Sequence, residues 1–143
     1  MADITLTELA DFGLASVVAR HGGIPDAGTL WAVAPGQWLA FAASAAPDWA
    51  ETLGERLVGV ADVVDQSSAY VLWQVSGADA QSLLQKGLPV DLAALTPGAT
   101  AVSAIAHIGV IVHCPAPGTY HLASFRSFAL SLRDWLDASI AAL

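Results

Sequence analysis

The chain has 143 residues, the size of one domain, and we expect a single domain made of an N-terminal segment, 1–28, and a core, 29–143. Five scattered basic residues stand against thirteen acidic ones, for a net charge of −8, so we expect neither nucleic-acid binding nor recruitment to an anionic membrane surface. Only 13% of the residues are charged, against about 25% in ordinary soluble domains, which predicts an unusually apolar surface.

The first part of the chain predicts a short helix and then a β-hairpin. Apolar residues with mixed spacing over 6–18 favour the helix, with Gly22-Gly23 as its stop. Residues 30–43 predict the hairpin, with its turn at Pro35-Gly36. Proline fixes φ at the first central residue of a tight turn, and glycine supplies the positive φ that a type II turn needs at the second.

A helix is predicted over 48–57. Asp48 and Glu51 have the spacing of an N-cap and the third residue of a capping box. Apolar residues recur every four positions, which gives the helix one buried stripe. That stripe consists of Trp49, Leu53 and Leu57.

Two strands and a third helix follow. Residues 60–64 and 70–75 are rich in β-branched and aromatic side chains, and a polar turn over 65–68 separates them. We expect Ser76 to cap the next helix and Gly87 to end it. The predicted buried face of this helix is Ala80, Leu83 and Leu84.

The last third predicts a loop, three strands and a closing helix. Pro89 and Pro97 mark the loop. Regular apolar spacing from Phe128 to Ile140 predicts a helix of about four turns. The strands are expected at 102–105, 109–114 and 120–124.

A weak internal repeat relates two parts of the chain. Residues 34–39 and 116–121 share an Ala-Pro-Gly turn followed by an aromatic residue, and each copy leads into a helix. Chance agreement is the alternative. With the elements above, the repeat predicts an α+β fold in which antiparallel strands are covered by helices on one side, built from a duplicated strand-turn-strand-helix unit.

The uncharged composition has two interpretations. A membrane span over 27–47 is rejected, because Pro35-Gly36 interrupts it and Pro47 ends it before about 20 apolar residues are reached. Either an apolar surface is covered by a partner, or alanines raise the apolar content without forming a patch. The lone Cys114 excludes an intrachain disulfide and fits a reducing cytoplasm, and residues 1–8 show no secretory signal, so we expect a cytoplasmic protein.

Candidate chemical groups are few. His107, His113 and His121 would form a metal site only if the tertiary structure brought them together. Cys114 adjoins His113, but neighbours on a strand point to opposite faces, so we expect Cys114 to be a small buried hydrophobe. Asp62 and Asp65 flank a turn, where aspartate is an ordinary residue, although a carboxylate pair could also serve as acid and base. We find no credible catalytic set.

Several short motifs recur in a familiar order between residues 65 and 136. They are Ser76-Gly77, Lys86-Gly87 and Asp91-Leu92, followed by His107-Ile108-Gly109-Val110, Arg126-Ser127-Phe128 and Trp135-Leu136. In this order and spacing the chain resembles the gamma subunit of heterotetrameric sarcosine oxidases, over roughly 30–136.

The resemblance implies a fold akin to the folate-binding aminomethyltransferases of the glycine cleavage system. It also implies a non-catalytic structural subunit of an oxidoreductase complex that acts in sarcosine catabolism and one-carbon metabolism. Its partners would be the alpha and beta subunits, which hold FAD, FMN, NAD and tetrahydrofolate. We therefore expect no catalytic, cofactor-binding or metal site in this chain, and the motif positions of His107 and Arg126 make them the candidate partner interface.

Two alternatives stay open. A free-standing protein that binds folate or transfers one-carbon groups would need a carboxylate for the pterin, and the candidates are Asp62, Asp65 and Asp91. A homodimeric scaffold would pair its apolar face with itself. Self-association of the isolated chain is expected for the scaffold, and also for a subunit deprived of its partners.

Overall fold

The computed structural model describes residues 2–143, which divide into two compact units. Unit 1 is formed by the chain up to Leu9 and by Tyr70–Leu143, and unit 2 by Ala10–Ala69. The predicted N-terminal segment therefore contributes a strand to each unit. Each unit has its own antiparallel sheet and its own hydrophobic cluster. Whether the two units fold as one domain stays a prediction.

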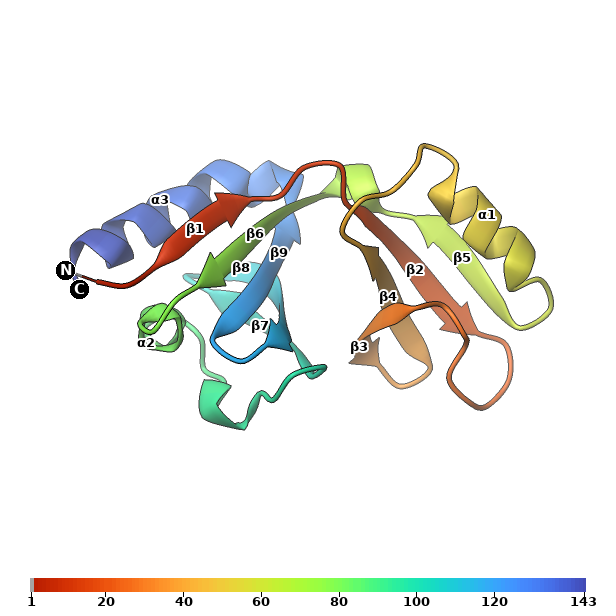
Figure 1. The fold of residues 1–143 in the computed structure, drawn as a ribbon, viewed down its shortest axis with the longest axis horizontal. Coiled ribbons are helices and arrows are strands. Elements are labelled where there is room, and N and C mark those ends of the chain that lie inside the picture. The colour runs from red at the N-terminus through yellow and green to blue at the C-terminus, as the bar shows by residue number, and fades with distance from the viewer. Residues whose placement is uncertain (1) are drawn as a thin grey trace. The chain divides into compact units, whose positions relative to one another are not determined.

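Unit 2 contains a four-stranded sheet in the order β3-β4-β2-β5, with helix α1 on one face (Figure 1). Gly36 has a φ of +70°, as the predicted turn requires, so the hairpin is confirmed. The elements are β2 (Gly13–Ala19), β3 (Thr29–Ala34), β4 (Gln37–Ala42), α1 (Trp49–Arg56), β5 (Ala61–Asp65) and the short 3-10 helix η1 (Ser67–Ala69).

The predicted helix over 6–18 is wrong. Residues Thr5–Glu8 form strand β1 of unit 1, and β2 follows in unit 2. In β1 only Leu6 is half-buried and the other residues are exposed, while Gly13, Leu14 and Ala15 are buried on both faces of β2. The mixed apolar spacing arose because the segment contains two strands with different burial patterns. Pairing of these strands with other strands overrides the local helix propensity. Gly22-Gly23 accordingly lies in the loop after β2 and ends no helix.

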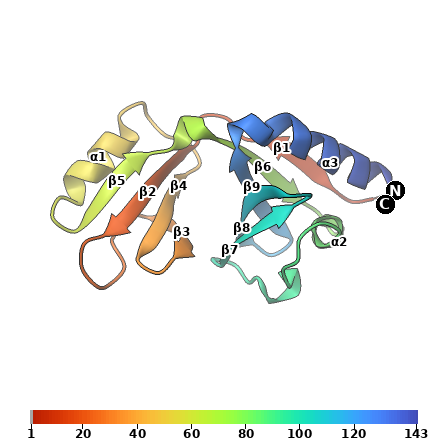
Figure 2. The ribbon, with the colours of Figure 1, turned by 180° about the vertical axis from the view of Figure 1, so that it is seen from behind.

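Unit 1 contains a five-stranded sheet in the order β1-β6-β9-β8-β7. Two helices cover one of its faces (Figures 1 and 2). The strands and the closing helix predicted from the sequence are confirmed. The elements are β6 (Tyr70–Ser76), α2 (Ala80–Gln85), η2 (Leu92–Ala94), β7 (Thr100–Ile105), β8 (Ile108–Ala116), β9 (Thr119–Phe125), η3 (Arg126–Phe128) and α3 (Ala129–Ala141).

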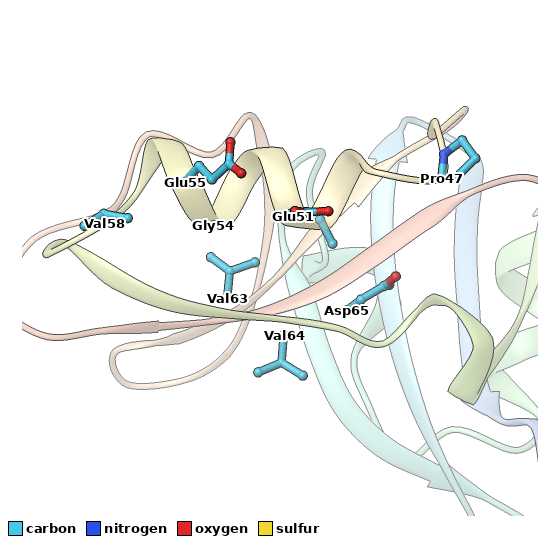
Figure 3. Close-up of a pocket in the computed structure, with 9 residues that line it drawn as sticks. Pro47, Glu51, Gly54, Glu55, Val58, Val63, Val64 and Asp65 are labelled. Atoms are coloured by element: carbon cyan, nitrogen blue, oxygen red, sulfur yellow. The ribbon is translucent and has the colours of Figure 1, made fainter.

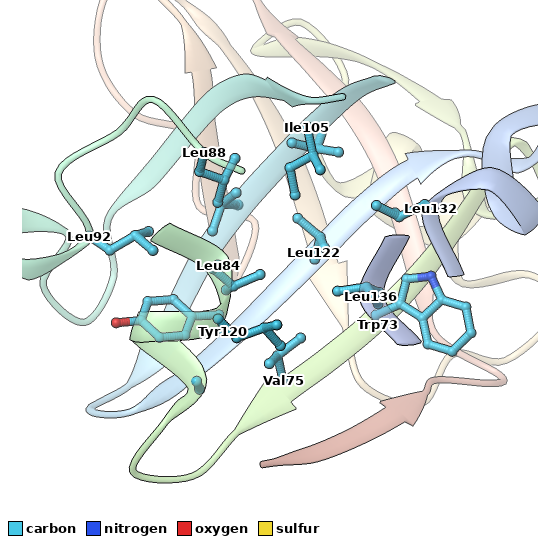
Figure 4. Packing of buried hydrophobic residues seen from close by; sticks show 14 of the residues in the cluster. Trp73, Val75, Leu84, Leu88, Leu92, Ile105, Tyr120, Leu122, Leu132 and Leu136 are labelled. Atoms are coloured by element: carbon cyan, nitrogen blue, oxygen red, sulfur yellow. The ribbon is translucent and has the colours of Figure 1, made fainter. Parts of the chain in front are cut away.

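The core of unit 1 lies between its sheet and its helices (Figure 4). Leu122 of β9 is fully buried and lies opposite Trp73 of β6. Leu132 and Leu136 project from α3 onto the same face, and α2 contributes the predicted Leu83 and Leu84. Burial of these side chains supplies the main stabilising term of the unit.

The two units share a strand-turn-strand-helix element, which supports the predicted duplication. Each contains a hairpin, β3–β4 or β8–β9, whose second strand also pairs with an earlier strand of the same sheet, β2 or β6, although in unit 1 β7 lies between that strand and the hairpin along the chain. Each hairpin turns at a glycine with a φ of +70°, Gly36 or Gly118, and each leads into a helix, α1 or α3. The fold class predicted from the sequence, antiparallel sheet covered by helices on one side, is confirmed.

Two predicted helix caps differ in the structure. Asp48 stands at the N-cap of α1 without a capping hydrogen bond from its side chain, and the N-cap of α2 is Asp79 instead of Ser76. The Asp79 carboxylate accepts a hydrogen bond from the backbone N–H of Asp3 at 2.7 Å, and the Asp3 carboxylate accepts one from Ala78 N–H at 3.0 Å. These contacts fasten the start of β1 to the start of α2.

Gln85 is expected to stabilise the loop after α2. Its Nε2 donates to the carbonyls of Leu88 and Val90 at 3.1 and 2.6 Å, and its Oε1 accepts from Leu92 N–H at 3.3 Å. We expect Gln85→Ala to lower the free energy of unfolding by about 2 kcal/mol, because it leaves three backbone groups without their partner. Urea denaturation measures this change. Gln81→Ala, an exposed position on the same helix, should cost less than about 0.5 kcal/mol, and equal losses would contradict the assigned role.

Candidate functional site

A row of polar side chains crosses the helix-free face of the unit 1 sheet. Strand register places its members directly opposite one another on five neighbouring strands. They are Thr7 on β1, Gln74 on β6, His121 on β9, His113 on β8 and Thr100 on β7. Directly opposed residues on one face are close enough for their side chains to interact. No local sequence pattern predicts this row, because its members are far apart along the chain.

The two histidines of the row are buried and close together. Their ring centroids lie 6.4 Å apart in a stacked arrangement. Thr100 Oγ1 lies 2.7 Å from His113 Nδ1, and Gln74 Oε1 lies 3.1 Å from His121 Nε2. Burial, with a further contribution from His121, lowers the pKa of His113 from 6.5 to about 4, and burial also lowers the pKa of His121. Both imidazoles are therefore neutral at pH 7, and both are held by hydrogen bonds.

The third histidine considered for a metal site lies elsewhere. His107 is exposed in the β7–β8 turn, where Ala106 and His107 have φ values of 49° and 67°. The structure thus brings together two of the three predicted imidazoles. Across residues 2–143, no group of three or more histidine, cysteine, aspartate or glutamate side chains is arranged to hold a metal ion.

The candidate carboxylates are engaged in local interactions. Asp62 pairs with Arg20 at 2.8 Å, and Asp65 accepts hydrogen bonds from the Ser67 N–H and hydroxyl at 3.0 and 2.7 Å. Asp91 accepts from the Ala93 N–H at 3.1 Å. Positions three apart on a strand face opposite sides, so Asp62 and Asp65 do not form a carboxylate pair. The turn-forming interpretation of Asp65 is confirmed.

Cys114 lies in the core of unit 1, as predicted. It is 2% exposed and belongs to the hydrophobic cluster, whereas His113 lies in the row on the opposite face. Its thiol donates to the carbonyl of Ala116 at 3.2 Å, and burial raises its pKa. A thiol that remains protonated is a poor nucleophile, and the two neighbours do not form a nucleophile and base pair.

The predicted interface residues lie at one end of the unit 1 sheet, opposite the β8–β9 turn. His107 precedes β8, and Arg126 follows β9, its partner in the hairpin. The Arg126 guanidinium donates to the carbonyl of Tyr70 at 3.2 Å, and the Tyr70 ring stacks on Phe125 at 5.0 Å. Phe125 and Phe128 are 53% and 44% exposed. We call these five residues the aromatic end surface; exposed aromatic and arginine side chains are typical of protein interfaces.

An open groove with a volume of about 600 Å³ lies in unit 2 between α1 and β5 (Figure 3). Its walls combine apolar side chains with carboxylates. From α1 and its ends it is lined by Pro47, Ala50, Glu51, Gly54, Glu55 and Val58, and from β5 by Val63, Val64 and Asp65. Glu51, Glu55 and Asp65 are exposed. We call this feature the α1–β5 groove; the sequence did not predict it.

A solved structure shares the fold of this chain. No protein-family model matches the sequence, and no curated protein matches it significantly. The structure is similar to a chain of the heterotetrameric sarcosine oxidase from Corynebacterium sp. U-96 in complex with pyrrole 2-carboxylate, with a TM-score of 0.84. The alignment covers 97% of this chain and 84% of that chain at 21% identity. At this identity the similarity shows a shared fold, which agrees with the sequence resemblance.

The helices of the described chain are all too short or too polar to cross a membrane.

Proposed function

We propose that this chain is the gamma-type subunit of a heterotetrameric sarcosine oxidase complex and serves its assembly. The fold shared with a chain of such an enzyme over 97% of the present chain carries the proposal. The engaged state of its candidate groups also supports an assembly role: Asp62 is ion-paired, Asp65 and Asp91 hold turns, and Cys114 is part of the core. Sarcosine, FAD, FMN, NAD and tetrahydrofolate would be bound by the other subunits.

Co-expression with alpha and beta subunits tests the proposal. Native mass spectrometry should show one copy of this chain in a flavin-containing assembly. Omission of the chain should lower the yield of that assembly. A stable monomer or homodimer that ignores the large subunits would contradict the proposal. Quenching of tryptophan fluorescence by micromolar tetrahydrofolate in the isolated chain would support the folate-binding alternative instead.

The aromatic end surface is the proposed contact with a large subunit. Arg126→Ala is expected to weaken assembly about tenfold, because arginine beside exposed aromatic rings is a typical binding hot spot. His107→Ala should weaken it less, since this turn residue lies at the edge of the surface. Affinity is measured by titrating the purified variant into the complex of large subunits.

Arg133→Ala provides the matched control for Arg126→Ala. Arg133, like Arg126, is an exposed arginine. It lies on α3, where it pairs with Asp137 at 2.9 Å and lies over the Trp73 ring. Arg133→Ala should leave the affinity for the large subunits within about twofold of that of the parent chain. If the Arg126→Ala chain instead unfolds at a much lower urea concentration than the parent chain, the hydrogen bond from Arg126 to the Tyr70 carbonyl is structural. The interface assignment would then be wrong.

A further inference from the structure

The outer edge of β5 is open to strand addition. Within the part of the chain that the structure describes, β5 is the terminal strand of the unit 2 sheet and pairs only with β2. Backbone bonds from Arg20 N–H to Val60 and from Gln66 N–H to Leu14 fix which β5 residues face β2. Because inward and outward pairs alternate along an antiparallel strand, the N–H and C=O of Val63 point away from β2, toward the open edge.

Exposed valines lie in β5 and just before it, and the strand also carries Asp65 and an Asp62 that is paired with Arg20. Val58, Val60 and Val64 are 77%, 47% and 55% exposed. Sheet proteins normally protect edges with charges, proline or bulges, and an exposed apolar edge is a template for pairing with another chain. The α1–β5 groove runs along this edge and gives room for the side chains of an added strand (Figure 3).

The charges of the groove select among possible occupants. Glu51, Glu55 and Asp65 line it, and none of its lining residues is basic. A second copy of this chain carries a net charge of −8 and presents the same acidic groove, so self-pairing would place like charges together. An added strand with lysine or arginine at alternating positions would instead meet these carboxylates, with apolar side chains against the valines.

We propose that the α1–β5 groove binds an extended segment of another subunit, which adds to β5 as a fifth strand and carries basic and apolar side chains in alternation. Main-chain hydrogen bonds to the open edge would supply affinity, and the groove would supply specificity. The proposal relies on the proposed function for the source of the segment. The aromatic end surface belongs to unit 1, so the two contacts can be tested separately.

A synthetic ten-residue peptide of alternating lysine and valine serves as the probe. We expect it to bind the full-length chain in fluorescence anisotropy, whereas a peptide of alternating glutamate and valine should not. Amide exchange at Val63 should slow about tenfold when the lysine peptide is bound. Because no other subunit is present, this result does not depend on whether the sarcosine oxidase assignment is right.

Matched charge reversals separate groove binding from general attraction to an acidic protein. Glu55→Lys should weaken binding of the lysine peptide about tenfold, while Asp134→Lys, the same charge change at an exposed position of α3, should leave it within about twofold. Both variants must first show the unfolding midpoint of the parent chain. Equal weakening by the two variants, or unchanged exchange at Val63, would overturn the proposal.

The same variants then test the assembly. If the groove receives a strand from a large subunit, Glu55→Lys lowers the affinity for those subunits and Asp134→Lys does not. Peptide binding at the groove together with normal assembly of Glu55→Lys would overturn the assignment of the strand to a large subunit. Failure of the parent chain to assemble would overturn the proposed function itself, a result distinct from either outcome at the groove.

Discussion

Gly77→Ala is expected to lower the free energy of unfolding by about 3 kcal/mol. Gly77 has a φ of +118°, a region that side chains rarely adopt. A Cβ atom at this position would also overlap the backbone carbonyl oxygen of Asp3. Because a backbone atom cannot turn aside as a flexible side chain does, the start of β1 must shift. The shift would break the Asp3 contacts with Ala78 and Asp79.

Gly118→Ala is the matched control for this prediction. Gly118 lies beside Gly77, whose N–H donates to its carbonyl at 3.2 Å, and it also has a positive φ, of +70°. The nearest atom to its added Cβ lies 3.8 Å away, so this variant meets no steric overlap. Gly118→Ala should lower the free energy of unfolding by about 1 kcal/mol. Urea denaturation compares the two, and equal losses would show that overlap with Asp3 has no part in the effect.

The stability of the chain is expected to fall as the pH drops from 6.5 toward 4. In the folded state burial lowers the pKa of His113 to about 4, and that of His121 is also lowered. Within this window the unfolded chain takes up protons that the folded chain does not, so acid favours unfolding. Each histidine that stays neutral when folded contributes a slope of up to about 1.4 kcal/mol per pH unit. Above the ordinary histidine pKa the contribution is complete and stability becomes level.

Urea denaturation across this pH range measures the slope. His113→Gln keeps a hydrogen-bonding side chain beside Thr100 but cannot titrate, so its slope should be shallower than that of the parent chain. His107→Gln removes a histidine from an exposed turn and should leave the slope unchanged. Parallel curves for the parent chain and His113→Gln would show that the buried pair does not cause the acid sensitivity.

Much of the local structure could be predicted because the signals are local. Pro35-Gly36 and Pro117-Gly118 each specify a tight turn, and both hairpins form around them. The closing helix follows from the regular stripe that includes Leu132 and Leu136, both fully buried. The order of the motifs around His107 and Arg126 indicated a resemblance to sarcosine oxidase gamma subunits, and a solved sarcosine oxidase chain shares the fold.

The candidate sites could be predicted only in part. The sequence identified His113 and His121 as candidates, yet strand register alone placed them opposite each other and in a row with Gln74. The α1–β5 groove depends on strand order: β2 pairs with β5 on one side and with β4 on the other, and this order leaves β5 at the edge of the sheet. Register and strand order are set by contacts between residues distant in sequence, which no local pattern specifies.

The sequence by itself determined the acidic charge, the turns, the helices α1 to α3 and most strands, because these follow from composition, turn chemistry and side-chain periodicity. Only the tertiary structure decided that residues 6–18 form two strands of different sheets, since burial of Leu6 and Leu14 against separate partners outweighs local helix preference. It also decided which edge stays open and which histidines meet. Both outcomes depend on strand order and register, which are set by contacts between residues that are distant in the sequence.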